Sequence, residues 1–83
     1  IAYKLDDNAT VSLRIFTLSG GLVFEETYTA GAAGGRAGLN EVVWDGRNGD
    51  GDYVATGGYV LLVKAEGTGE TLHTMRRKIA VVR

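Results

Sequence analysis

The side chains most able to do chemistry are concentrated between residues 44 and 59 of this 83-residue chain. Four of them carry oxygen atoms of the kind that calcium takes as ligands: Asp45, Asn48, Asp50 and Asp52. An EF-hand loop needs ligands at its first and twelfth positions around a glycine at the sixth. With Gly51 as that glycine, those positions fall on Gly46 and Gly57, which carry no ligand. The EF-hand is therefore excluded, and a nonstandard calcium site in residues 45–52 stays open.

Catalytic chemistry has little support elsewhere in the sequence. His73 is the single histidine, cysteine is absent, and neither Ser12 nor Ser19 lies in the G-x-S-x-G elbow of a hydrolase. The glycine-rich residues 31–38 lack the Lys-Ser/Thr of a phosphate-binding loop. We therefore predict no catalytic residues, no cofactor and no metal, and interpret His73 as an exposed or rim residue of a strand.

The charge balance argues against nucleic acid and membranes as partners. Nine basic and ten acidic residues give a net charge of -1, so no bulk attraction draws the chain to polyanions. Residues 76–78 form a basic run, Arg-Arg-Lys, whose members alternate sides in a strand. Four acidic residues are available to neutralise this run across strands: Glu25, Glu26, Glu66 and Glu70. No apolar stretch approaches the ~20 residues of a membrane span, so we expect no membrane insertion.

Glycine spacing and an apolar period of two predict the elements that position these residues. Thirteen glycines separate short segments rich in β-branched and aromatic residues, and no segment keeps a helical period. The strands expected are 1–5, 11–16, 22–29, 39–44, 59–65 and 71–82, joined by a mobile connection at 30–38, a polar loop at 45–58 and a turn at 67–69. The segment 59–65 is almost continuously apolar, which is typical of a central strand covered on both faces. These segments predict an all-β sandwich of about six or seven strands in two facing sheets.

The stretch from Trp44-Asp45-Gly46-Arg47 to Gly58-Tyr59 resembles the W-D-G-R and G-x-Y signature of the FlgD immunoglobulin-like family. The opening segments 1–5 and 11–16, the turn at Ser19-Gly20 and the closing segment 77–82 are also similar to that family, so the resemblance covers essentially the whole chain. Seven residues make up the expected structural motif: Trp44, Asp45, Gly46, Arg47, Gly51, Gly58 and Tyr59.

The resemblance implies an immunoglobulin-like antiparallel β-sandwich, with residues 1–83 as one module in the C-terminal part of a larger exported bacterial protein. Such modules are noncatalytic and serve assembly, spacing or attachment at the cell surface. The implied partners are other domains of the same polypeptide or the assembly and export machinery. The implied location is extracellular or at the cell surface, and the module is expected to be monomeric.

Each motif residue has a physical reason to be structural. The Trp44 indole brings apolar area and an N–H group that needs a partner. The Asp45 carboxylate can accept hydrogen bonds from the backbone that follows it, and Gly46 permits a left-handed backbone. Gly58 is expected to let the loop enter the next strand sharply at Tyr59.

Two other functions remain open at this stage. One is an accessory domain that binds a ligand. The ligand would be calcium, or a carbohydrate held by exposed rings of Phe24, Tyr28 or Tyr53. The flagellar hook-capping domain itself is the other.

Overall fold

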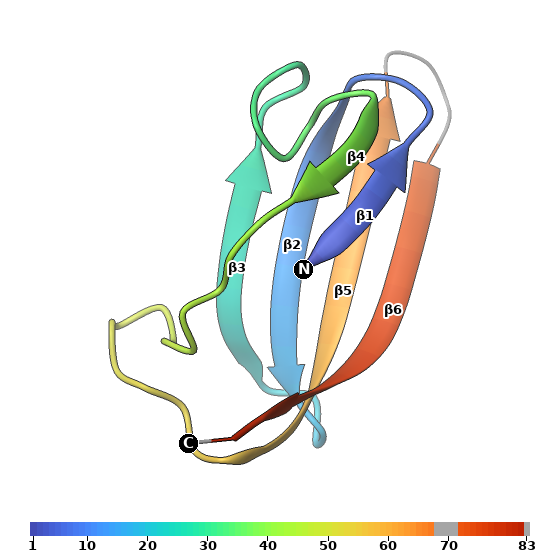
Figure 1. Cartoon of the computed structure of the whole chain (residues 1–83). Helices are drawn as coiled ribbons and strands as arrows, with labels where there is room; N and C mark the ends of the chain where they lie inside the picture. The colour runs from blue at the N-terminus through green and yellow to red at the C-terminus, as the bar shows by residue number, and fades with distance from the viewer. Residues whose placement is uncertain (68–71, 83) are drawn as a thin grey trace.

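A computed structural model describes the backbone of residues 1–67 and 72–82, and all the described side chains except those of Leu72 and His73. Six strands form it (Figure 1): β1 (Ala2–Leu5), β2 (Ala9–Thr17), β3 (Leu22–Tyr28), β4 (Gly38–Glu41), β5 (Gly57–Gly67) and β6 (Leu72–Val81). The turn expected at 67–69 lies mostly outside the described residues, as do Glu70 and Arg83. Within the described residues no helix occurs, and hence none long and apolar enough to cross a membrane.

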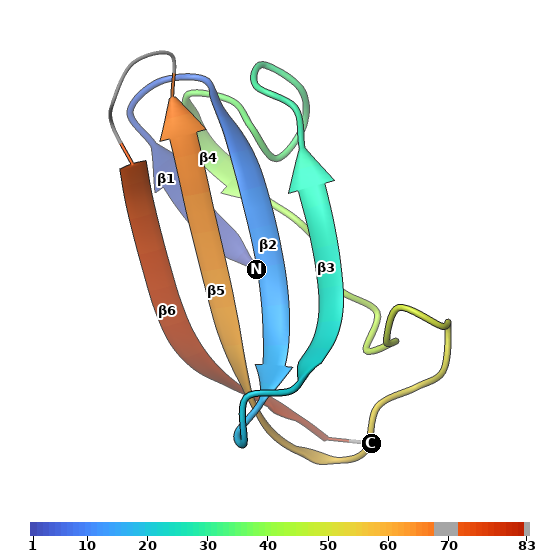
Figure 2. The same cartoon turned by 180° about the vertical axis from the view of Figure 1, so that it is seen from behind.

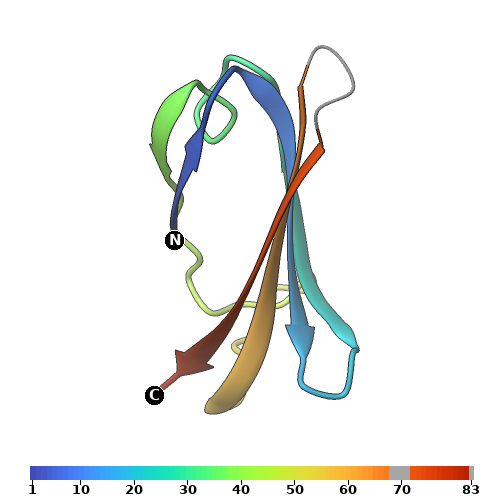
Figure 3. The same cartoon turned by 90° about the vertical axis from the view of Figure 1, so that its right-hand side faces the viewer.

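The strands form two antiparallel sheets of unequal size. Four strands make the larger sheet in the order β3-β2-β5-β6, and β1 and β4 make the smaller one. The view from behind shows the larger sheet in front of the smaller one (Figure 2), and the side view shows the two as separate layers (Figure 3). The all-β sandwich predicted from the alternating segments is confirmed, with six strands in the described part of the chain.

The core lies between the two layers and follows from the period of two in β2 and β5. Every second residue of these strands points inward and is buried, and Tyr3 and Leu5 of β1 cover them from the other layer. The buried apolar residues of β2 and β5 are Ala9, Val11, Leu13, Ile15, Tyr59, Leu61, Val63 and Ala65.

Two expectations about strands need correction. The segment 39–44 forms a strand only as far as Glu41, because the chain then leaves the sheet to carry Trp44 into the loop that follows. The segment 59–65 does lie centrally, between β2 and β6, but the coverage expected on both faces is wrong. Its outer residues Val60 and Leu62 are only half-buried, because the smaller sheet covers a single face of the larger one.

Residues 30–38 are a compact, hydrogen-bonded connection rather than the mobile one expected. Gly35 is buried, and its carbonyl oxygen accepts hydrogen bonds from Ala9 N at 3.0 Å and Gly31 N at 2.9 Å. The Tyr3 hydroxyl donates to the Gly34 carbonyl oxygen at 2.6 Å, and burial raises the pKa of Tyr3 to about 12. The connection is therefore fixed to both β1 and β2.

The edge strands of the larger sheet carry charge on their inner faces. Glu26 of β3 is paired with the buried Leu13, and Arg77 of β6 with the buried Leu61, so both side chains leave the sheet on the side of the core. Both are exposed. A charge that points inward on an edge strand opposes pairing with another sheet.

Candidate functional site

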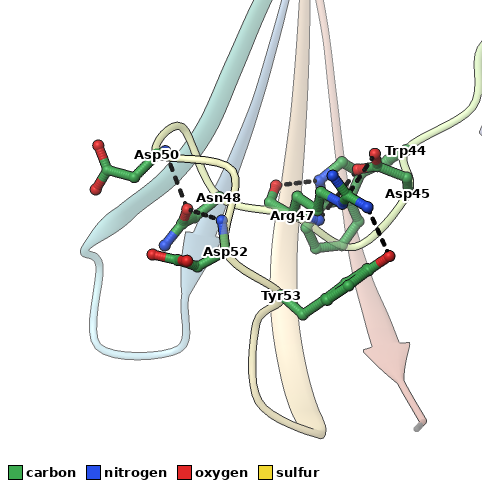
Figure 4. A network of polar contacts seen from close by, with 7 residues as sticks. All are labelled: Trp44, Asp45, Arg47, Asn48, Asp50, Asp52 and Tyr53. Atoms are coloured by element: carbon green, nitrogen blue, oxygen red, sulfur yellow. Dashed lines mark hydrogen bonds and ion pairs between the residues drawn. The ribbon is translucent and has the colours of Figure 1, made fainter.

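Trp44 anchors the loop from residue 42 to residue 56 against the larger sheet. Figure 4 shows the polar contacts within this loop. Its ring lies 6.3 Å from that of Phe24 and 6.2 Å from that of Tyr59, the latter edge-on, between ring centroids. Its indole Nε1 donates to the Arg47 carbonyl oxygen at 2.8 Å. The apolar part of Trp44 thus packs on the core, while its polar group is satisfied within the loop.

Arg47 joins the two halves of the loop. Its guanidinium donates to the Tyr53 hydroxyl at 2.8 Å and lies 4.6 Å from the centroid of the Tyr53 ring. The Asp45 carboxylate accepts a hydrogen bond from Arg47 N at 3.2 Å and lies 3.6 Å from the guanidinium Nε. The hydrogen bond to Tyr53 and, more weakly, the charge of Asp45 raise the pKa of Arg47. This cation is therefore directed at its own loop.

Asn48 organises the turn between the two halves. Its side-chain oxygen Oδ1 accepts hydrogen bonds from Asp50 N and Asp52 N, both at 3.0 Å. Its backbone N–H donates to the Asp52 carbonyl oxygen at 2.8 Å. Gly51 has a φ of 87°, in the left-handed region that favours glycine. Asn48 thus fixes the backbone of this turn through its own side chain.

Of the remaining motif residues, Gly46 lies in the loop, whereas Gly58 and Tyr59 lie in β5. Gly46 has a φ of 80°, and its carbonyl oxygen accepts from Val54 N at 2.8 Å. Tyr59 is buried, and its hydroxyl donates to the Ala55 carbonyl oxygen at 2.7 Å. Gly58 does not make the sharp entry expected of it, because β5 already begins at Gly57 and Gly58 is a regular strand residue paired with Ala80.

The loop offers little as a metal or sugar site. The described residues include no group of three or more His, Asp or Glu side chains placed to hold a metal ion. A groove of about 500 Å³ runs beside the loop between Phe24 and Asn48. Of the aromatic rings, all of them described, Tyr53 alone is exposed, whereas Phe24 and Tyr28 are half-buried against the core. The pair of exposed rings that a sugar platform would need is thus not formed by these residues.

The residues considered for nucleophilic catalysis are not brought together as a site. Ser12 is paired with Thr27 and Lys64 in the middle of the larger sheet. Ser19 lies in the β2–β3 turn, with its hydroxyl 3.0 Å from that of Thr17. The backbone of His73 lies in β6 opposite Ala65, and its side chain is outside the described residues.

The basic run at 76–78 is not neutralised as expected within the part of the chain described here. Glu25 pairs with Arg14 instead, because the two are directly opposed in β2 and β3. No ion pair joins the run to a described carboxylate. Glu70, the fourth acidic residue considered, lies outside the described residues.

Sequence reasoning missed two contacts that hold the loop, namely the Arg47–Tyr53 pair and the packing of Phe24 on Trp44. Neither follows a periodic pattern, because one joins two points of an irregular loop and the other joins that loop to a distant strand.

Two facing antiparallel sheets with an aromatic-anchored loop beside them define an immunoglobulin-like β-sandwich domain. The model of the FlgD Ig-like domain family matches residues 1–69, which is most of the chain. The chain therefore belongs to the FlgD Ig-like domain family, a structural type of domain. Comparison with curated proteins and with solved structures gave no match.

Proposed function

We propose that this domain is a noncatalytic module that serves assembly, spacing or surface attachment in a larger exported bacterial protein. Its membership of the FlgD Ig-like domain family, whose name points to flagellar hook capping, supports a role in assembly. In this proposal the domain's partners are other domains of the same polypeptide or the assembly and export machinery, and its location is extracellular or at the cell surface.

One observation carries the proposal. In the loop from residue 42 to residue 56, polar side chains form hydrogen bonds within the loop itself. The Trp44 indole, the Arg47 guanidinium and the Asn48 amide oxygen all have partners between residues 45 and 53. A catalytic or ligand-binding site would be expected to direct such groups toward a substrate. The hydrogen bonds of these three side chains instead stabilise one conformation of the loop.

The test is to remove residues 1–83 from the natural polypeptide and to follow export, surface display and the folding of the remaining domains. We expect the neighbouring domains to fold while export or display falls. A matched variant carries Trp44→Ala in the intact polypeptide, which disturbs the domain without shortening the chain. Export and display that are unchanged by the deletion would contradict the proposal.

The family name supports a second candidate, a domain of the hook-capping protein itself. The same deletion separates the two, because a hook-capping domain is expected to affect flagellar hook growth and motility specifically. A loss of surface display with normal hooks would favour the more general role.

A further inference from the structure

Within the described residues, β3 and β6 are the outer strands of the larger sheet, so each has a neighbouring strand on one side only (Figure 2). The two strands run in opposite directions, because all three pairings of this sheet are antiparallel. β6 of one copy of the chain placed beside β3 of another would therefore continue the antiparallel pattern. The loop from residue 42 to residue 56 reaches the outer edge of β3 near the start of that strand, where Gly49 N donates to the Val23 carbonyl oxygen at 3.0 Å. Residues 24–28 lie beyond this contact.

The backbone groups on both outer edges have the orientation that such pairing needs. Thr17 N donates to the Gly21 carbonyl oxygen across the turn between β2 and β3, so the odd-numbered residues of β2 bond toward β3. The registers carry this alternation across the sheet. As a result, odd-numbered residues within 24–28 of β3 and even-numbered residues of β6 direct their N–H and C=O groups outward. In the middle of the two strands these residues are Glu25, Thr27, Arg76 and Lys78.

The inner faces of β3 and β6 carry side chains in the same order: apolar, charged, apolar. The inward residues, each paired with a buried residue of the neighbouring strand, are Phe24, Glu26 and Tyr28 on β3 and Met75, Arg77 and Ile79 on β6. The four apolar residues are half-buried, whereas Glu26 and Arg77 are exposed. Neither charge forms an ion pair within the part of the chain that the structure describes. The two strands therefore present opposite charges in the middle of matching apolar rows.

One register brings both rows together. It places Glu26 of one copy opposite Arg77 of the next, and unlike charges directly opposed across two strands stabilise the pairing. The half-buried apolar side chains would then cover one another, and a second pair of unlike charges would form on the outer face. The residues with outward backbone groups would also oppose one another, as hydrogen-bonded pairs require. In this register the further pairs are Phe24 with Ile79, Tyr28 with Met75, Glu25 with Lys78 and Thr27 with Arg76.

Other pairings of these edges are less favourable. Joining two β3 edges would bring acidic residues together, and joining two β6 edges would bring the basic runs at 76–78 together. An inward charge on an edge strand also excludes strands that do not neutralise it. Unrelated strands would have to supply an inward basic residue at β3 and an inward acidic residue at β6, whereas the chain itself supplies both. A second copy of the chain is therefore the occupant that these side chains specify.

We propose that copies of this domain associate head to tail through the larger sheet, with residues 75–79 of β6 antiparallel to residues 24–28 of β3 in the next copy. This goes beyond the proposed function, because it requires neither export nor a different partner. The two joined edges differ, so a pair of copies still presents one edge of each kind and further copies can add. The contact is short, so we expect the association to be weak in solution.

The experiment is a concentration series of the isotope-labelled 83-residue chain, followed by nuclear magnetic resonance and by sedimentation. As the protein concentration rises into the millimolar range, the sedimenting mass should increase. The amide signals of the outward residues on both edges should shift together, and those of β1, which lies in the other sheet, should not. Added salt should weaken the association, because it screens exposed charges.

Charge exchange makes the test specific. Glu26→Lys or Arg77→Glu alone opposes like charges at every junction, so each should weaken the association at least about fivefold, as for the loss of an ion pair of about 1 kcal/mol. A mixture of the two variants should associate as the unmodified chain does, because junctions between unlike variants restore unlike charges. Both residues are exposed, so both variants should fold. The matched control is Lys4→Glu, which changes the net charge as Arg77→Glu does but lies in the smaller sheet.

Several results would overturn the proposal. They are an unmodified chain that stays monomeric at millimolar concentration, single variants that associate like Lys4→Glu, and a mixture that associates no better than either variant alone. Sedimentation of the natural polypeptide with the same substitutions should give the same order. A different order there would show that other residues cover these edges, which also overturns the proposal. These measurements involve no export, so they can fail while the deletion experiment succeeds.

Discussion

The indole Nε1 of Trp44 and the carbonyl oxygen of Arg47 are joined at 2.8 Å by a hydrogen bond that closes the start of the loop on itself. The same indole ring packs between Phe24 of β3 and Tyr59 of β5. One side chain therefore links the conformation of the loop to the core of the sandwich.

Replacement of Trp44 separates these two contributions. Trp44→Phe keeps a ring but removes the N–H donor, so we expect a loss of about 1 kcal/mol in the free energy of unfolding. Trp44→Ala also removes the packing and should cost about 2–3 kcal/mol, less than for a fully buried tryptophan. Chemical denaturation measures both. Equal losses for the two variants would show that packing contributes nothing beyond the hydrogen bond.

The glycines of the 30–38 connection give a second prediction. Gly34 has a φ of 90°, and a Cβ there would lie 2.5 Å from the Tyr28 ring; a Cβ on Gly35 would lie 2.5 Å from the carbonyl oxygens of Ala9 and Thr29. We expect Gly34→Ala and Gly35→Ala each to cost more than about 2 kcal/mol.

Gly49→Ala is the matched control for these two variants. A Cβ at Gly49 meets nothing within 4 Å, and its φ is not in the left-handed region. The expected change is within about 0.5 kcal/mol. Thermal melting of the three variants checks the order, and a Gly35→Ala variant as stable as Gly49→Ala would contradict the described path of the connection.

The raised pKa of Tyr3 predicts that the free energy of unfolding decreases at alkaline pH. Burial raises its pKa from 10.0 in the unfolded chain to about 12 in the fold. Between pH 10 and about 12 the folded state therefore keeps the Tyr3 proton that the unfolded state loses. The contribution of Tyr3 to the free energy of unfolding is complete below pH 10 and is lost as the pH rises to about 12. Tyr28 contributes in the same direction, because burial raises its pKa as well.

Tyr3→Phe is the variant that tests this dependence. It removes one ionising group, so the free energy of unfolding should fall less steeply between pH 10 and 12 than in the unmodified chain. Below pH 10 the variant should be less stable by about 1 kcal/mol, because the Gly34 carbonyl oxygen loses its donor. Urea denaturation at a series of pH values measures this dependence. If the free energy of unfolding falls as steeply with pH in Tyr3→Phe as in the unmodified chain, the assignment to Tyr3 is refuted.

Calcium is expected to leave the thermal midpoint unchanged. The Asn48 side-chain oxygen already accepts two backbone hydrogen bonds, and the carboxylates of Asp50 and Asp52 are exposed in the loop. A ligand that binds only the folded state must raise its stability. A midpoint that rises at millimolar calcium, and fails to rise in Asp50→Asn, would restore the nonstandard site.

The strands were predictable because burial in this fold follows a period of two. Val11, Leu13 and Ile15 alternate with polar residues, and this is the face that the smaller sheet covers. The outer face of β5 misled the prediction because Val60 and Leu62 are as apolar as the buried residues beside them. Apolar content alone cannot distinguish a covered face from a half-exposed one.

The candidate site was predictable only in part. The Trp44–Tyr59 block indicated a structural loop, but the pairing of Arg47 with Tyr53 depends on how the chain turns at Asn48. The fixed path of residues 30–38 depends on the Tyr3 hydroxyl and on Ala9, which are distant in sequence. Contacts of this kind carry no local signal, and glycine-rich composition suggested mobility instead.

The pairing of β2 with β5 has a consequence for how the chain acquires its structure. β2 pairs on one edge with β3, which follows it directly in the sequence. Its other edge pairs with the distant β5, where Ala9 is opposite Gly67. β1 similarly pairs with β4, where Ala2 is opposite Glu41. A fold dominated by such distant pairings forms slowly, over milliseconds to seconds. Residues as far as Gly67 must therefore have left the ribosome before the larger sheet can form completely.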